Sequence, residues 1–160
     1  MKSPKKITVD FDPDTLDMMF RRLKETRWPD IIGEDEWVYG VPRSWLQEMV
    51  DFWVSEWDWK KISDQINEWD NYVVEIEGIP VHYLHAPGKG PNPKPIILTH
   101  GWPWTFWDFK DVIGPLSDPE KYGGNPEDSF DVYVPSLPGF AFSTPLAHSG
   151  VDVRRVAELW

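Results

Sequence analysis

The sequence predicts an α/β fold in which a helical N-terminal part precedes a β-sheet. Apolar residues recur at helical spacing between residues 12 and 69, which indicates amphipathic helices. From residue 72 onward the pattern changes to the alternation that is typical of a β-hairpin. A short apolar run at residues 96–98 is then followed by a glycine-containing turn and an aromatic segment. Strand, turn and helix in this order are typical of α/β folds with a buried parallel strand.

Three helices are expected in the N-terminal part, after an extended lead at residues 1–10. Asp12 starts the first helix as its N-cap, with Pro13 at the first helical position. Pro42 opens the second helix after a loop at residues 30–41, and Asp58 caps a third, shorter helix. The second helix carries an apolar stripe that we expect to pack in a core. The stripe consists of Leu46, Met49, Val50, Trp53 and Trp57.

The second part of the chain contains the expected strands. Residues 72–77 and 81–85 predict a hairpin with a turn at 78–80, and the run 96–98 predicts a strand buried on both faces. A helix is expected at about 105–116, a strand at 130–134 and a further helix from about 151, whereas residues 135–145 are too rich in proline for regular structure. We therefore divide the chain into a helical extension, residues 1–71, and a sheet-forming part, residues 72–160.

Composition excludes several classes of function. The formal charge of −11 argues against nucleic acid as a partner, because binding phosphates requires a basic surface. The sequence has no cysteine, which excludes disulfides and thiolate metal sites. No apolar run reaches the roughly 18 residues of a membrane span, and the N-terminus does not resemble a signal peptide. A soluble cytoplasmic protein is therefore expected.

The most informative segment is His-Gly-Trp-Pro at residues 100–103, which we call the HGWP turn. It ends the apolar strand, and in an α/β fold such a turn presents backbone N–H groups at the carboxyl end of the sheet. Donors in that place can stabilise an oxyanion as it forms. No metal site is expected, because His82 and His85 have neither a third ligand nor an acidic pair nearby. The sequence has no glycine-rich phosphate cradle either, so no cofactor is expected.

Motifs along nearly the whole chain resemble the N-terminal part of the microsomal-type epoxide hydrolases, a family with the α/β-hydrolase fold. The short motif of the HGWP turn is weak evidence by itself, but all motifs occur in the family's order. They are residues 27–30 (Arg-Trp-Pro-Asp), 37–40 (Trp-Val-Tyr-Gly), 52–59, 76–78 (Ile-Glu-Gly), 100–103, 115–119, 123–124 (Gly-Gly), 135–139 (Pro-Ser-Leu-Pro-Gly) and 142–145 (Phe-Ser-Thr-Pro).

The resemblance implies an α/β-hydrolase sheet of which residues 72–160 supply the first four strands, behind the helical arm 1–71. It also implies hydrolysis of a small apolar epoxide to a vicinal diol through an aspartyl ester. The backbone N–H of Trp102 would then belong to the oxyanion hole, and a cis Pro103 would aim it. His100 and Gly101 would shape the turn. Trp104 stands where the family often has glycine, so Trp102 and Trp104 would contact substrate and Trp104 would narrow the site.

The same resemblance implies that the nucleophilic aspartate, the two acid tyrosines and the base histidine are not in this chain. The nucleophile elbow, which reads roughly Gly-Gly-Asp-Trp-Gly in the family, has no match in residues 1–160. We therefore expect an incomplete fold, an N-terminal fragment that is inactive alone and whose unpaired strand edge allows self-association. Two alternatives stay open. One is a hydrolase related to haloalkane dehalogenases, and the other is a non-catalytic binding module that uses the tryptophan-rich surface.

Overall fold

Residues 3–32 and 36–160 are described by a computed structural model, so part of the loop expected at 30–41 lies outside the described residues. The chain divides into two units. One consists of the residues up to Val9 together with Gln65–Trp160, and the other of Asp10–Asp64. Within the described residues no helix is both long and apolar enough to cross a bilayer.

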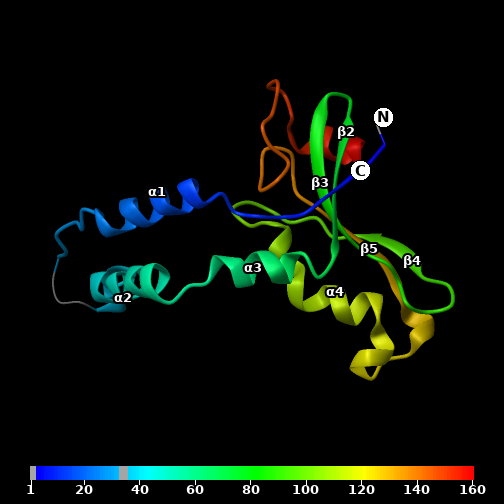
Figure 1. Ribbon diagram of the computed structural model, residues 1–160, viewed down its shortest axis with the longest axis horizontal. Helices are drawn as coiled ribbons and strands as arrows, with labels where there is room; N and C mark the ends of the chain where they lie inside the picture. Colours follow the sequence, from blue (N-terminus) through cyan, green and yellow to red (C-terminus); the bar gives the residue numbers. More distant parts are fainter. Residues whose placement is uncertain (1–2, 33–35) are drawn as a thin grey trace. The chain divides into compact units, whose positions relative to one another are not determined.

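The first unit is built on a mixed sheet whose five described strands have the order β1-β2-β3-β5-β4 (Figure 1). β1 (Lys5–Ile7), β2 (Asp70–Ile76), β3 (Ile79–Ala86) and β5 (Phe130–Pro135) are antiparallel neighbours. β4 (Lys94–Ile97) lies parallel to β5 at the other edge. The α/β fold class predicted from the sequence is confirmed, and so are the hairpin and the strand at 130–134. A strand also forms at the apolar run 96–98, but the prediction that it is buried on both faces is wrong, because Ile97 is 47% exposed and no residue of β4 is buried.

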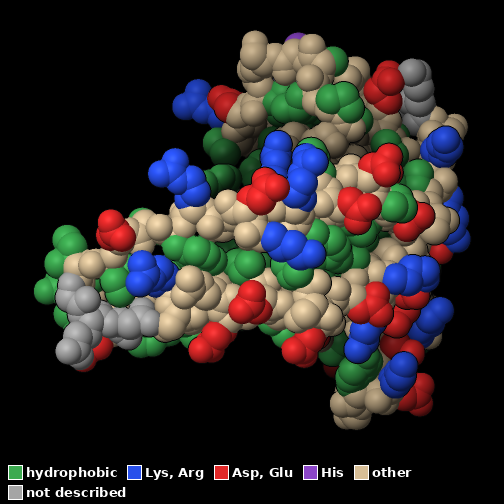
Figure 2. All heavy atoms as spheres, turned by 60° about the vertical axis from the view of Figure 1, so that its left-hand side comes forward, with side chains coloured by type: hydrophobic (Ala, Val, Ile, Leu, Met, Phe, Trp, Pro, Cys, Tyr) green, Lys and Arg blue, Asp and Glu red, His purple; other side chains and the backbone are tan. Residues whose placement is uncertain are grey.

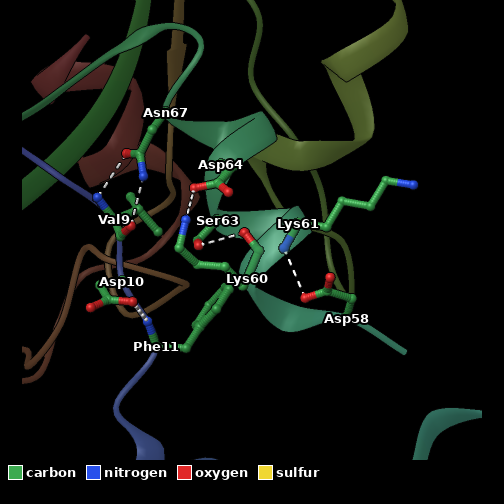
Figure 3. Close-up of polar contacts among 9 residues, drawn as sticks. All are labelled: Val9, Asp10, Phe11, Asp58, Lys60, Lys61, Ser63, Asp64 and Asn67. Atoms are coloured by element: carbon green, nitrogen blue, oxygen red, sulfur yellow. Dashed lines mark hydrogen bonds and ion pairs between the residues drawn. The ribbon is translucent and has the colours of Figure 1, made fainter. Parts of the chain in front are cut away.

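The N-terminal lead differs from its expectation, because residues 5–7 form strand β1. Lys5 pairs with Val73 and Ile7 with Asn71, so β1 extends the sheet beyond the hairpin. A side chain holds the segment that follows. The N–H of Val9 donates to Oδ1 of Asn67 at 2.8 Å, and Nδ2 of Asn67 donates to the Val9 carbonyl at 2.7 Å (Figure 3). Asn67 thereby satisfies both backbone groups of Val9, as a partner strand would.

The two faces of the sheet carry different layers, because residues alternate along β3. On one face, Val81 packs with Leu159 of α5 (Val153–Leu159). On the other face, the His82 ring contacts Phe106, which begins η2 (Phe106–Phe109). η2 leads directly into α4 (Lys110–Ser117), which contacts β3 and β5. The expected helix at 105–116 is thus a 3-10 turn followed by an α-helix. The polar excursion contains η3 (Pro119–Tyr122) and η4 (Pro126–Asp128).

The second unit contains α1 (Pro13–Lys24), η1 (Trp37–Tyr39), α2 (Arg43–Ser55) and most of α3 (Trp59–Ile66). The predicted caps are confirmed. The Asp12 side chain accepts from the Thr15 N–H at 3.1 Å, and Oδ1 of Asp58 accepts from the Lys61 N–H at 3.1 Å (Figure 3). Pro42 immediately precedes α2, as expected.

The prediction that the α2 stripe packs in a core is wrong. Leu46 is 39% exposed and Trp53 is 42% exposed, and no residue of α2 is fully buried. The helical period was read correctly, but an apolar stripe does not reveal whether a partner surface is present. The η1 segment is more exposed still, with Tyr39 at 80%. Figure 2 shows hydrophobic side chains at the surface of this unit, at the left of the view.

Candidate active site: the HGWP turn

The HGWP turn begins where β4 ends. Pairing with β5 continues one residue past β4, because the Leu98 N–H donates to the Tyr133 carbonyl at 2.9 Å. Parallel neighbours end at the same edge of a sheet, so the turn after β4 meets the segment after β5. The N–H of Leu137 from that second segment donates to Nε2 of His100 at 3.0 Å. The fold therefore joins the two loops that the resemblance singled out.

Both ring nitrogens of His100 are engaged. Because Nε2 accepts from Leu137, the ring proton of a neutral His100 lies on Nδ1, which donates to the Gly101 carbonyl at 3.1 Å. The ring is also buried, at 5% exposure, and stands edge-on to Phe140. A histidine with both nitrogens bound to backbone has none left to accept a proton from water. This geometry favours a structural role for His100.

A tight reverse turn spans residues 101–104. The Trp104 N–H donates to the Gly101 carbonyl at 2.9 Å, and the Trp102–Pro103 peptide bond is cis, which makes this a type VI turn. Glycine itself is not demanded at 101 by the described residues. Gly101 has no positive φ, and an added Cβ would meet no atom within 4 Å. Its carbonyl, which accepts two hydrogen bonds, is the group that closes the turn.

The backbone N–H of Trp102 makes no hydrogen bond to any described residue. The Trp102 side chain is 80% exposed and that of Trp104 is 60% exposed, so the turn faces open space. A cavity of about 440 Å³ lies elsewhere and is lined among others by Glu68, His85 and Lys121. The turn thus offers one backbone donor that has no partner among the described residues.

The segment after β5 contains a residue with left-handed backbone. The φ of Ala141 is 43°, in the left-handed region. Glycine enters this region without steric cost, whereas alanine places its Cβ against the following carbonyl. Around it the segment is closed by backbone hydrogen bonds. The Gly139 N–H donates to the Ser143 carbonyl, and the Ser143 N–H donates to the Phe140 carbonyl.

Sequence reasoning missed a buried polar cluster behind the turn. His82 is fully buried, with Nδ1 2.8 Å from Oγ of Ser136 and Nε2 3.1 Å from Oδ1 of Asn71. Burial lowers the pKa of His82 from its ordinary value of 6.5 to about 4. The available signal was the position of this histidine on the same face of β3 as Leu84, which is also fully buried. A polar ring on such a face requires buried partners.

One acidic residue lies beside His85 in the structure. Nε2 of His85 lies 3.0 Å from Oδ1 of Asp131, and its ring stacks on Tyr133. Burial raises the pKa of Asp131, but hydrogen bonds from His85 and Tyr133 outweigh it and hold that pKa below the ordinary value. The described residues contain no group of three potential metal ligands from histidine, aspartate and glutamate.

The sequence profile of the family described as "Epoxide hydrolase N terminus" matches residues 4–109. A protein of Stigmatella aurantiaca that carries the provisional name epoxide hydrolase is 41% identical over 140 residues, which are 88% of this chain and 32% of that protein. Epoxide hydrolase 1 of Oryctolagus cuniculus is 28% identical over 158 residues, which are 95% of this chain and 34% of that protein. This chain therefore spans about one third of the length of these relatives.

Solved structures agree with this likeness. The epoxide hydrolase of Aspergillus niger superposes with a TM-score of 0.82 at 26% identity, over 98% of this chain and 41% of that chain. The juvenile hormone epoxide hydrolase of Bombyx mori has the same fold, with a TM-score of 0.83 at 23% identity over 98% of this chain and 42% of that one. The profile, the relatives and the fold agree, and the chain belongs to the epoxide hydrolase N-terminus family.

Proposed function

We propose that this chain supplies the oxyanion-binding turn of an epoxide hydrolase that converts an apolar epoxide to a vicinal diol. The observation that carries the proposal is the unpaired backbone N–H of Trp102, in a turn that His100 and Gly101 hold from behind. An N–H without an internal partner is free to bind an oxygen that becomes negatively charged during reaction. Family membership supports the reaction class.

The proposed reaction has two steps. A carboxylate oxygen of an aspartate attacks a ring carbon of the epoxide, the carbon–oxygen bond breaks, and the ring oxygen takes a proton from a tyrosine. A water molecule, deprotonated by a histidine, then attacks the carbonyl carbon of the resulting ester. The carbonyl oxygen becomes an oxyanion, which the Trp102 N–H binds. Collapse of this intermediate releases the diol and restores the aspartate, and the proton that the histidine took from water returns to the tyrosinate. In this scheme the side chains of Trp102 and Trp104 border the substrate.

The chain alone is expected to be inactive, because the proposed nucleophile, acid and base are not among its residues. Incubation of residues 1–160 with a styrene-type epoxide should yield no diol above the rate in buffer. We expect diol from a chimaera in which residues 1–160 replace the matched part of the Stigmatella relative and are followed by the rest of that protein. The two controls are the intact Stigmatella relative and the rest of that protein alone. Diol from residues 1–160 alone would contradict the proposal, and so would a folded but inactive chimaera.

We further propose that the isolated chain self-associates through β4. Among the described strands β4 pairs only with β5, and Ile97 on it is 47% exposed. An apolar strand with an open edge can pair with another chain. Sedimentation should show association that increases with concentration and weakens in Ile97→Lys. Val112→Lys is the matched control, because Val112 is 44% exposed but lies on α4. Equal association of both variants would exclude β4 as the contact.

A further inference from the structure

Four polar side chains form one buried cluster between β2, β3 and the segment after β5. Asn71, His82, Ser136 and Ser143 are each at most 1% exposed. We call these four residues the His82 cluster. The side-chain hydrogen bonds within it measure 2.8–3.1 Å. Oγ of Ser143 accepts from the His82 N–H at 2.9 Å and donates to the Ser136 carbonyl at 2.8 Å. The Ser136 N–H in turn donates to the His82 carbonyl at 2.9 Å.

The hydrogen bonds fix where the proton of His82 lies. Nδ2 of Asn71 donates to the carbonyls of Ile66 and Trp69, both at 3.0 Å, so Oδ1 of Asn71 is an acceptor toward His82. Nε2 of His82 therefore carries the proton, and Nδ1 accepts from the Ser136 hydroxyl. A buried imidazole with a pKa of about 4 is neutral at pH 7, which agrees with a single ring proton.

This arrangement holds the segment that supports the HGWP turn. Ser136 is tied to His82 through both its hydroxyl and its backbone N–H. The next residue, Leu137, donates its N–H to Nε2 of His100. His100 in turn donates from Nδ1 to the Gly101 carbonyl, one residue before the free N–H of Trp102. A continuous path of hydrogen bonds and one peptide link therefore runs from the core of the sheet to the turn.

We propose that His82 and Ser136 are positioning residues, which set the direction of the Trp102 N–H through Leu137 and His100. The proposal rests on the function proposed above, because it gives that N–H its purpose. Stability alone is a poor reason for this cluster. Four polar side chains in an apolar interior contribute little net stability compared with apolar residues of the same shape, but they do specify a unique arrangement. A loop whose N–H must point in one direction benefits from such specificity.

Ser136→Ala tests the link, with Ser129→Ala as its matched control. Both serines are buried and they flank β5, but among the described residues the Ser129 hydroxyl accepts only from the Gly90 N–H, away from the turn. In the 160-residue chain, amide hydrogen exchange at Leu137 should accelerate about tenfold in Ser136→Ala, the loss of roughly one hydrogen bond. In Ser129→Ala it should stay within about twofold of the parent. Equal exchange in both variants would overturn the proposal.

Two substitutions of His82 distinguish the loss of its hydrogen bond to Ser136 from a general destabilisation of the fold. His82→Asn keeps an acceptor oxygen near the place of Nδ1, within reach of Ser136, whereas His82→Gln extends its amide toward Asn71 instead. Both lose the ring contacts with Phe106 and Phe142. Slow exchange at Leu137 should be retained in His82→Asn and lost in His82→Gln. Faster exchange at Leu137 in His82→Asn than in His82→Gln would overturn the Ser136 link. Equally fast exchange in the two variants, at equal melting temperatures, would overturn it as well.

Kinetics in the chimaera distinguish this inference from the proposed function. Ser136→Ala should lower kcat about tenfold and lower KM with it, so that kcat/KM stays nearly unchanged, because only hydrolysis of the ester, and not its formation, depends on the N–H direction. If exchange at Leu137 responds as expected but kcat does not, the positioning role is overturned. If removal of the Trp102 N–H itself leaves kcat unchanged, the proposed function fails instead, and the hydrogen-bond path stands only as a structural feature.

Discussion

Replacing Trp102 with proline in the chimaera is expected to slow hydrolysis of the aspartyl ester about 100- to 1000-fold, a loss of about 2.7–4 kcal/mol of transition-state stabilisation. Proline has no backbone N–H, so the substitution removes the proposed donor itself. Formation of the ester should continue, because no oxyanion develops on the aspartate while it attacks the epoxide. The ester should therefore accumulate, and rapid mixing followed by intact-mass measurement would detect it as added mass of one substrate.

The matched control for this prediction is Trp102→Ala. Alanine removes the same indole, which is 80% exposed, but keeps the N–H. Its ester hydrolysis should remain within about tenfold of the parent, because an exposed side chain contributes to substrate binding more than to the charged intermediate. Melting temperatures of the two variants must agree before the rates are compared. Equal rates of ester hydrolysis in the proline and alanine variants would remove the Trp102 N–H from the mechanism.

The parts of the fold that the sequence predicted correctly have strong local signals. Asp12 and Asp58 are caps whose side chains bond within their own helices, and β3 shows two-residue alternation. The hairpin turn was predicted at 78–80, but the loop consists of Glu77 and Gly78, because Glu77 has a φ of 51° and Ile79 already pairs with Ile76. A left-handed backbone conformation at a glutamate cannot be recognised from the residue type. Pro80 also suggested a turn, because proline has no N–H to donate inside a sheet. It nevertheless lies in β3, where β5 pairs only from Tyr83 onward and needs no N–H from Pro80.

Features that depend on distant partners were not predicted. β1 is three residues long and exists because residues 71–73 pair with it, so its own residues carry no periodic signal. The HGWP turn was identified from a motif, but its link to Leu137 requires two parallel strands to end together. The His82 cluster joins residues as far as 61 positions apart in the sequence. A single histidine among apolar residues indicates that buried partners exist, without revealing which residues they are.

The stability of the chain is expected to fall by roughly 3 kcal/mol between pH 7 and pH 4 because of His82 alone. Burial lowers the pKa of His82 to about 4 in the folded chain, against 6.5 when it is exposed. Below pH 6.5 His82 is protonated in the unfolded chain but stays neutral in the folded chain. Acid therefore favours unfolding until the pH falls below the pKa that His82 has in the folded chain. Its described neighbours Asn71, Ser136 and Ser143 are uncharged, so no nearby charge compensates for the burial of an imidazolium.

Urea unfolding at several pH values would measure this effect, with His82→Asn as the comparison. That variant has no titrating group at position 82, so its free energy of unfolding should change much less than that of the parent from pH 6.5 to pH 4, although it is lower at pH 7. The carboxylates whose pKa is lowered, Asp12, Asp70 and Asp131, contribute stability that begins to be lost below about pH 5, and this loss is common to both proteins. Parallel pH profiles of the two proteins would mean that the His82 ring accepts a proton without cost, which the burial of this cluster does not allow.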